Sequence, residues 1–151
     1  MSTSPSAPVV VETVLSEADR DAITRIRTTV FVEEQQVPPE IEQDPYDATA
    51  LHWIARDSET KEPLGTARLV DRGNGVGKIG RVAVLPEHRG RGIGNALMHA
   101  VVSQAREHRF AVLMLDAQVH VVPFYERLGF AAEGPEFLEA GILHRRMTRF
   151  L

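Results

Sequence analysis

Three glycines at alternate positions, Gly90, Gly92 and Gly94, separate a short apolar segment from a long amphipathic one. The first segment, 78–85, has the β-branched texture of a strand, and the second, 93–108, repeats apolar residues at helical spacing. Glycines before a helix expose backbone N–H groups, which together with the helix dipole attract an anion. These residues therefore predict a strand, an anion-binding turn and a helix, with phosphate or pyrophosphate as the natural ligand.

Basic side chains accompany these glycines. Arg89 and Arg91 stand beside them, and with Arg81 and His88 nearby we expect a locally positive site. The whole chain is acidic, because 17 Lys and Arg against 21 Asp and Glu give a net charge of -4. It therefore has no overall field that would attract nucleic acid or an anionic membrane, and its anion site must be local.

Two common phosphate-binding motifs do not fit. A Walker P-loop needs Lys and then Ser or Thr after its last glycine, whereas Gly94 is followed by Asn95 and Ala96. A Rossmann fingerprint starting at Gly90 needs a small residue at position 95, where this chain has Asn95. That motif should also lie in the first strand-to-helix turn of a parallel sheet. The glycine spacing alone leaves two interpretations: an anion site of another class, or a tight turn beside solvated arginines.

Hydrophobic periodicity predicts a mixed α and β chain. We expect strands over 9–15, 51–56, 64–70, 78–85, 111–115, from 130 onward and over 143–150, and helices from 16 to about 31, over 93–108 and over 122–128. Short polar turns make the strands between 51 and 85 an antiparallel meander. The helix over 93–108 is a crossover to a parallel strand at 111–115, whose apolar run predicts burial on both faces. The acidic, proline-containing segment 33–47 predicts a loop or a broken helix.

The 151 residues have the length of one domain, which we assign to 9–151, with a flexible tail over 1–8. The tail has no positive charge and no long apolar run, so we expect neither a signal peptide nor a membrane span. The chain has no cysteine, which excludes disulfides and thiolate chemistry and fits a reducing compartment, so we expect a cytoplasmic protein.

Two motifs make this chain similar to a known superfamily. The stretch 89–94 resembles the Arg/Gln-x-x-Gly-x-Gly/Ala acetyl-coenzyme A signature of the GNAT N-acetyltransferases, and it likewise follows a strand. A second element of that family is matched by 122–130, in the expected order. The acidic segment 31–47 with His52, and the ending 139–144, resemble the ElaA/YjcF-like branch.

This resemblance implies an α+β fold with a mixed, mostly antiparallel central sheet of about seven strands, splayed between strands four and five and flanked by helices. It also implies acetyl-CoA as cosubstrate, held by backbone amides over 91–95 and by the backbone of the preceding strand. By motif position the coenzyme-binding residues are Val82, Ala83, Val84, Arg89, Gly90, Arg91, Gly92, Ile93, Gly94, Asn95, Gln118 and Phe124. Gln118 and Val121 depart from the family, which often has Asn and Ala there.

The resemblance implies direct attack of an amine on the acetyl thioester, with no acyl-enzyme, and assigns Tyr125 as general acid toward the leaving thiolate. From its own context, Tyr125 is equally a packing residue beside Phe124 and Phe130. An amine acceptor must also lose a proton before attack. The candidate bases or acceptor-binding residues, which sequence does not rank, are Glu33, Glu34, Asp44, His52, His120, Glu139 and His144. Histidine spacing typical of metal ligands is missing, so we expect no metal.

The leading hypothesis is therefore an N-acetyltransferase for a small-molecule or peptide amine, with no nucleic acid or membrane partner and a homodimer possible, as in the family. The acidic segment 33–47 favours a cationic acceptor. One alternative is an acyl-homoserine-lactone-synthase-like acyltransferase, because Arg27, Val30-Phe31, Glu42, Asp44, Asp47 and 67–69 resemble the front half of those enzymes. The other is a non-catalytic CoA-binding or sensing module.

Overall fold

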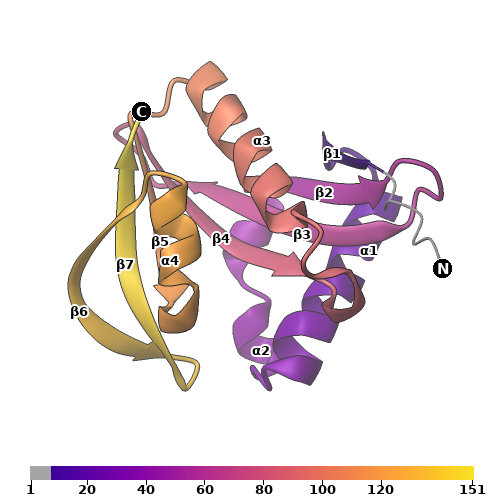
Figure 1. Cartoon of the computed structure of the whole chain (residues 1–151), viewed down its shortest axis with the longest axis horizontal. Helices are drawn as coiled ribbons and strands as arrows, with labels where there is room; N and C mark the ends of the chain where they lie inside the picture. Colours follow the sequence, from indigo (N-terminus) through magenta and orange to yellow (C-terminus); the bar gives the residue numbers. More distant parts are fainter. Residues whose placement is uncertain (1–7) are drawn as a thin grey trace, which may run out of the picture.

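The computed structural model describes residues 8–151, so residues 1–7 of the expected tail lie outside the described residues. The chain is a mixture of strands and helices, as predicted (Figure 1). The strands are β1 (Val9–Thr13), β2 (Leu51–Asp57), β3 (Pro63–Asp71), β4 (Val76–Val84), β5 (Val112–Gln118), β6 (Ala131–Glu139) and β7 (Ile142–Phe150). The α-helices are α1 (Glu17–Arg27), α2 (Pro39–Glu42), α3 (Ile93–Glu107) and α4 (Val122–Arg127). Single turns of other helix types are η1 (Thr28–Glu34), η2 (Pro45–Ala48), η3 (Pro86–His88) and η4 (Val119–Val121).

All seven strands form one sheet in the order β1-β2-β3-β4-β5-β7-β6. Five of its six pairings are antiparallel, and β4 with β5 is the parallel one. The predicted meander over β2, β3 and β4 and the predicted crossover through α3 are confirmed. The mixed, mostly antiparallel sheet with flanking helices is also the fold that the sequence resemblance implied.

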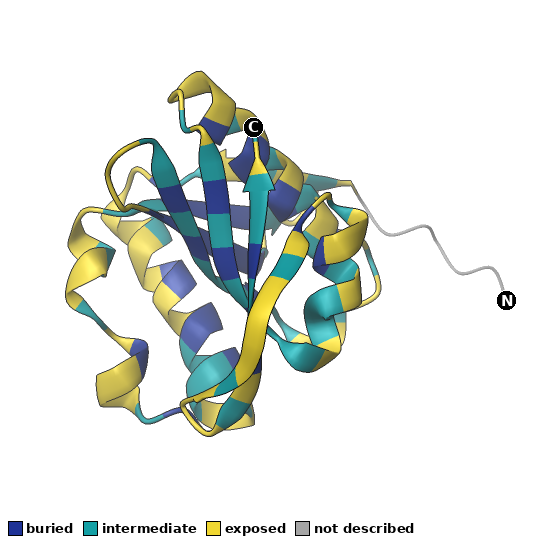
Figure 2. Ribbon diagram, turned by 90° about the vertical axis from the view of Figure 1, so that its left-hand side faces the viewer, coloured by how far each residue is buried: buried dark blue, intermediate teal, exposed yellow. Residues whose placement is uncertain are grey.

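Helices cover both faces of the sheet, with α3 and α4 on one face and α1 and α2 on the other (Figure 1). Alternation along β2 divides the core, since Trp53 and Ala55 join the cluster around α3 whereas Ile54 packs against Ile23 of α1. Strand β6, at the edge of the sheet, is mostly exposed (Figure 2). Most of the buried apolar surface therefore lies over β2 to β5, next to the splay.

Helix α1 begins where the sequence predicts, because the Ser16 hydroxyl accepts a hydrogen bond from the Asp19 amide. It ends earlier than predicted, at Arg27, and the chain continues as the π-helical turn η1. The expected broken helix over 33–47 is present as α2 and η2. The expectation that β5 is buried on both faces is wrong: Leu113, Leu115 and Ala117 are buried, whereas the alternate residues are half-buried. Two of these, Asp116 and Gln118, line a cleft.

The parallel pairing of β4 with β5 ends at Ile79 and Leu115, and beyond these residues the two strands separate. Just beyond, β4 carries a bulge in which Arg81 has the left-handed φ of +52°. Gly80 pairs with Arg68 of β3 and Ala83 pairs with Thr66, so Arg81 and Val82 together oppose one residue. Because of the extra residue, side chains of β4 after the bulge point to the opposite face from the one that the alternation before it would give. The edge of β4 that faces β5 is open beyond this point.

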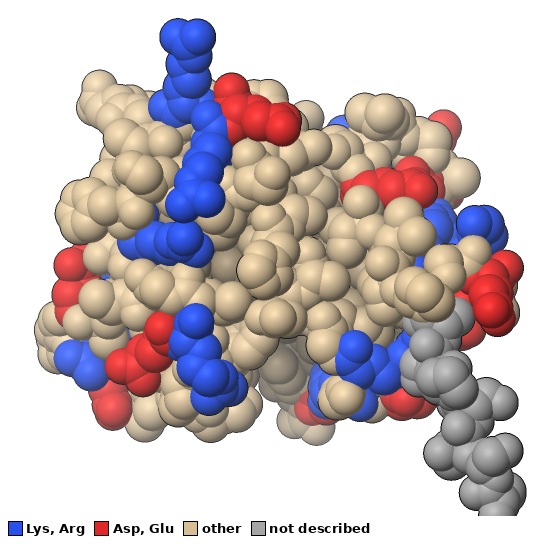
Figure 3. All heavy atoms as spheres, turned by 45° about the horizontal axis from the view of Figure 1, so that its top comes forward, with Lys and Arg blue, Asp and Glu red and all other residues tan. Residues whose placement is uncertain are grey.

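Acidic and basic side chains lie interspersed on the face of the molecule shown in Figure 3. Residues 8–151 form no helix with the length and apolarity that a membrane span requires.

Candidate active site

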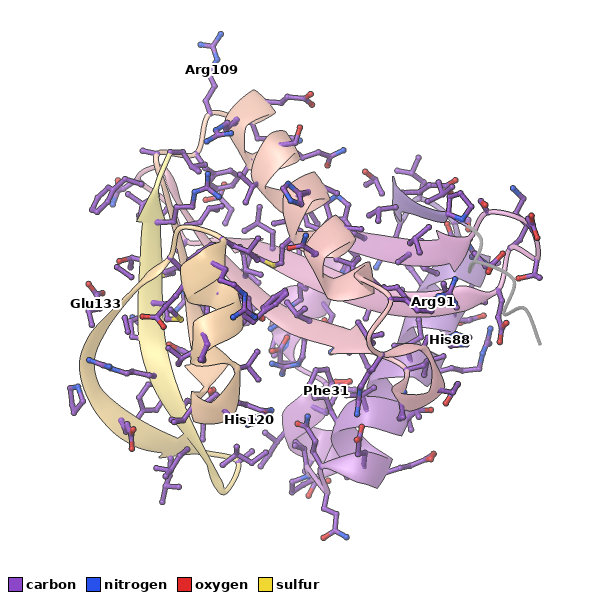
Figure 4. All side chains as sticks on the ribbon, in the orientation of Figure 1. Phe31, His88, Arg91, Arg109, His120 and Glu133 are labelled. Carbon is purple, nitrogen blue, oxygen red and sulfur yellow. The ribbon has the colours of Figure 1, made fainter. Side chains whose placement is uncertain are left out.

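A cleft of about 950 Å³ occupies the splay between β4 and β5. Its walls come from η1, α2, the sheet, α4 and the β6–β7 hairpin, and Figure 4 marks Phe31 and His120 on two of these walls. We distinguish two sides. The α3 side comprises Val82, Val84, Arg89, Gly94, Val121, Phe124 and Tyr125. The α2 side comprises Ile41, Glu42, Asp44, Tyr46, Arg68, Arg72, Lys78, Gly80, Asp116, Glu139 and His144.

The predicted anion-binding turn lies at the N-terminus of α3. Gly90 and Gly92 have φ of +84° and +76°, a conformation that glycine adopts without strain, and Gly92 caps the helix. The first helical hydrogen bond runs from the Ala96 amide to the Gly92 carbonyl, 3.0 Å apart. The amides of Ile93, Gly94 and Asn95 therefore have no partner within the helix, which suits them to bind an anion. Gly94 lines the cleft, and a Cβ there would lie 3.5 Å from the Phe124 ring.

The basic side chains around this turn are engaged in contacts. Arg89 forms a bidentate pair with Glu34, at 2.6 and 2.7 Å, and also donates to the Val84 carbonyl. Arg91 lies 3.0 Å from Nδ1 of His88 and 3.4 Å from Asp57. Figure 4 shows Arg91 and His88 together beside the start of α3.

Arg81 corrects the sequence analysis, which grouped it with the anion site. The bulge turns its guanidinium to the α2 side, where it donates to the Glu42 carbonyl at 3.0 Å and to Asp44 at 3.2 Å. A bulge leaves no signal in the periodicity of a strand, so the sequence could not show this reversal.

The open edge of β4 supplies a second feature of the α3 side. Val82 and Val84 pack toward the cluster around α3, whereas Ala83 packs against Ile26 and Val30 on the opposite face. All three line the cleft, beyond the last residue of β4 that pairs with β5. Gln118, across the splay, donates to the Gln35 side chain at 2.9 Å.

Tyr125 has both of the features that the sequence left as alternatives. Its ring packs edge to face against Phe124 and Phe130, with centroids 5.0 and 6.1 Å away, and it also lines the cleft. Burial raises the pKa of Tyr125 to about 12, because the phenolate would lose its hydration. The hydroxyl therefore stays protonated at neutral pH.

The structure separates the candidate bases. Glu34, Asp44, His120, Glu139 and His144 line the cleft, whereas Glu33 and His52 do not. His52 lies in a separate pocket of about 370 Å³, where its Nε2 atom is 2.9 Å from the Asp47 carbonyl. Ion pairing with arginines lowers the pKa of Glu34 and of Asp44, which makes both carboxylates poor proton acceptors.

His144 is buried, and the proton on its ring is fixed by its neighbour. Its Nδ1 atom lies 2.7 Å from the Ile142 carbonyl, which only accepts hydrogen bonds, so in the neutral ring Nδ1 carries the proton. Nε2 then has a free lone pair, 3.9 Å from the Glu139 carboxylate. The ring stacks on Phe137 with centroids 6.0 Å apart. This arrangement can accept a proton inside the cleft.

Three carboxylates of the acidic segment, Glu42, Asp44 and Asp47, are bound by arginines. Arg27 contacts Glu42 and Asp47, each at 2.7 Å, and Arg68 contacts Asp44 at 2.7 Å and Asp47 at 2.9 Å. With Arg81 these residues form one network, which we call the α2 network. Most of the residues that suggested a lactone-synthase-like enzyme belong to it, so their pattern is accounted for by packing. The same pairing leaves little free negative charge to favour a cationic acceptor.

The sequence analysis did not identify several residues of the α2 side, namely Tyr46, Arg72, Lys78, Gly80 and Asp116. Of these residues, Lys78 and Asp116 could have been recognised as site candidates from the sequence, because both are charged residues within or beside predicted strands. They form an ion pair at 3.2 Å across the parallel pairing, and Arg146 of β7 also contacts Asp116. Among residues 8–151, no three His, Asp or Glu side chains are arranged to hold a metal ion.

Comparison with known proteins agrees with this geometry. Residues 14–151 match the family model of the acetyltransferase (GNAT) domain. The chain is 37% identical over 125 residues to the uncharacterized N-acetyltransferase YjcF of Bacillus subtilis, which covers 82% of this chain and 87% of the relative.

Two solved structures share the fold. Escherichia coli ElaA is 28% identical with a TM-score of 0.84, covering 94% of this chain and 99% of that one. An acyl-CoA N-acyltransferase from Pseudomonas aeruginosa is 31% identical with the same TM-score and the same coverage. The chain therefore belongs to the GNAT acetyltransferase family and is of the ElaA and YjcF type.

Proposed function

We propose that this protein transfers the acetyl group of acetyl-CoA to a primary amine of a small molecule or peptide, by direct attack in a ternary complex. The observation that carries the proposal is that one cleft joins the free amides of α3, the open edge of β4 and the buried hydroxyl of Tyr125. In this proposal they serve as a pyrophosphate site, a strand edge for the pantetheine arm and a proton donor.

In this proposal, the coenzyme pyrophosphate binds the turn formed by Gly90, Arg91 and Gly92 and the amides of Ile93, Gly94 and Asn95. The pantetheine arm pairs with the backbone of Val82, Ala83 and Val84, as an added strand would. Phe124 packs beside Gly94 and contacts the arm, and the amide of Gln118 faces it from β5. Arg89 contacts the phosphates only after its ion pair with Glu34 breaks. Because this pair is exposed, breaking it costs little free energy.

The acceptor approaches from the α2 side. Its ammonium group gives a proton to Nε2 of His144, while Glu139 stabilises the imidazolium that results. The free amine then attacks the acetyl carbonyl carbon, forming the C–N bond and a tetrahedral intermediate. When that intermediate collapses, the C–S bond breaks and the electron pair leaves with the sulfur, and the second proton of the attacking nitrogen passes to that sulfur, so that the products are the neutral amide and the free thiol.

Tyr125 donates a hydrogen bond to the departing sulfur. A phenol of pKa about 12 is a weaker acid than a thiol of pKa about 8.5 in water, so full proton transfer to a hydrated thiolate is unfavourable. A sulfur leaving inside the same buried cleft also binds its proton more tightly, which reduces the difference. Tyr125 thus acts in the transition state, where the negative charge on sulfur develops.

A two-step experiment tests this function. Acetyl-CoA should raise the melting temperature, and thiol release should follow when a panel of polyamines, aminoglycosides, amino acids and peptide amines is added. Stabilisation with no thiol release from any amine would instead indicate a CoA-binding module. No stabilisation by acetyl-CoA, together with turnover of S-adenosylmethionine and an acyl-carrier donor, would indicate the lactone-synthase-like alternative.

A further inference from the structure

The α2 side of the cleft has basic groups that the protein's own carboxylates do not fully neutralise. From them we infer that the acceptor amine also carries a carboxylate, as an amino acid does, and that Arg72, Lys78 and Arg68 bind this carboxylate. The inference rests on the proposed acetyl transfer and names the class of its substrate.

Two carboxylates on this side, Asp44 and Asp116, already have two cationic partners each. Asp44 contacts both Arg68 and Arg81, and Asp116 contacts both Lys78 and Arg146. These contacts lower the pKa of Asp44 and of Asp116, so both carboxylates stay charged and occupied. A second ammonium group on the acceptor would find little free negative charge here, whereas an anion would find donors.

The Nε atom of Arg68 and the guanidinium of Arg72 have no hydrogen-bond acceptor among residues 8–151. Arg68 is only 6% exposed, and its Nε atom is buried without a hydrogen-bond partner among residues 8–151. A buried charged donor left unpaired is costly, and a ligand oxygen would satisfy it. Arg72 has no carboxylate within ion-pair distance in the same part of the chain, and its guanidinium stacks 5.7 Å from the centre of the Tyr46 ring. The N–H donors along the edge of a guanidinium group suit the two oxygens of a carboxylate.

Gly80 provides the space that such a ligand needs. It pairs with Arg68 across the β3–β4 register and lies two residues after Lys78 on the same strand face. A Cβ built on Gly80 would meet no atom within 4 Å, although the residue lies in the middle of the sheet. Space over the sheet is therefore bordered by the donors named above.

The β6–β7 end of the α2 side suits the amine of the same molecule. Glu139 lines the cleft without an Arg or Lys ion pair among residues 8–151, and it faces His144. A substrate with a carboxylate near Arg72 and Lys78 and an ammonium near Glu139 and His144 would pair both charges. Its amine would then lie where the sheet opens toward Tyr125.

Matched substrates test this inference. Amino acids and their amides differ in the carboxylate alone, and the amide has the less basic and therefore more available amine. We expect kcat/KM to favour the free amino acids by about tenfold or more, against that intrinsic difference. Amides or polyamines that are acetylated equally well or better would overturn the carboxylate assignment while leaving acetyl transfer intact, as would acetyl-CoA binding without turnover of any amino acid.

Variants locate the site. Arg72→Gln and Lys78→Gln should each raise KM for the preferred amino acid about tenfold and leave KM for its amide unchanged. Arg109→Gln removes the same charge at the far end of α3, where the side chain points away from the molecule (Figure 4), and should change neither. Equal effects on acid and amide would contradict the assignment.

A binding measurement separates the two proposals. The amino acid alone, without coenzyme, should raise the melting temperature of the wild-type protein more than its amide does, and Arg72→Gln should remove the difference. If acetyl-CoA fails to bind but this difference is present, acetyl transfer is wrong and the carboxylate site stands. Equal shifts for acid and amide would refute the carboxylate site whatever the coenzyme does.

Discussion

The two sides of the cleft present different chemical groups to a ligand. The α3 side consists mainly of backbone, with helix amides after Gly92 and the open edge of β4. The α2 side consists mainly of charged side chains brought together from α2, the turn before η2 and the strands β3 to β7. A backbone site is specified by a few consecutive residues, whereas a side-chain site exists only once distant elements are packed. This difference decides how each side responds to substitution.

The largest effect should come from the proton donor on the α3 side. Tyr125→Phe keeps the ring contacts with Phe124 and Phe130 but removes the hydroxyl, so we expect kcat to fall by about 10²–10⁴-fold. The rise in melting temperature with acetyl-CoA should remain, because no phosphate contact is lost. Since burial raises the Tyr125 pKa to about 12, the wild-type rate should show no loss from tyrosine ionisation up to pH 10. Full activity in the variant would remove Tyr125 from the mechanism.

The α2 network should respond to substitution through stability. Arg27→Met leaves Glu42 buried without its guanidinium, and we expect the free energy of unfolding to fall by about 3–5 kcal/mol in urea denaturation. Arg25→Met, on the exposed face of the same helix, should change it by less than about 0.5 kcal/mol. A small effect at Arg27 would mean that the network adds little to the packing of α1 and η2.

The same difference explains what could be predicted from sequence. Glycine spacing and helical periodicity act over a few residues, and they identified the turn, α3 and the order of strands. The α2 network depends on the bulge at Arg81 and on the register that sets Gly80 opposite Arg68. Neither leaves a local pattern, so Arg81 was assigned to the wrong side and Arg72 was not identified.

The location of His52 and the burial of β5 were not predictable for the same reason. His52 was one of the candidate bases, yet it lies in a separate pocket beside Asp47 of η2 and does not line the main cleft. The apolar run at 111–115 suggested a strand covered on both faces, but Val112 and Met114 on the alternate face are only half-buried. A sequence shows which residues are apolar but does not show where packing is interrupted.

Substitutions at Gly92 and Gly80 test whether the protein needs each glycine for its backbone conformation or for the free space beside it. Gly92 has a φ of +76°, so Gly92→Ala should lower the free energy of unfolding by about 1–2 kcal/mol and weaken acetyl-CoA binding. Gly80 has no such φ and no atom near a Cβ, so Gly80→Ala should change stability by about 0.5 kcal/mol or less. Thermal unfolding with and without acetyl-CoA measures both. Equal losses in the two variants would contradict the conformational role of Gly92.

The smallest effect should be a pH dependence on the α2 side. Burial lowers the pKa of His52, which in the folded protein stays neutral while its Nε2–H donates to the Asp47 carbonyl. Because the unfolded chain binds the proton near pH 6.5, stability is complete above that pH and is lost as pH falls toward the folded pKa. The network aspartates, whose pKa values are lowered by arginines, lose their contribution only below about pH 4.

His52→Gln isolates this contribution, since the amide still donates to Asp47 but does not titrate. Between pH 6.5 and 5.5 the wild-type protein should lose up to about 1 kcal/mol of unfolding free energy more than the variant, measured by urea denaturation at each pH. A difference of the opposite sign would mean that His52 is protonated in the folded state and belongs to the ion pairs of the α2 network. Parallel curves would show that it has no titration coupled to folding, so that the pH response of the α2 side resides in its carboxylates.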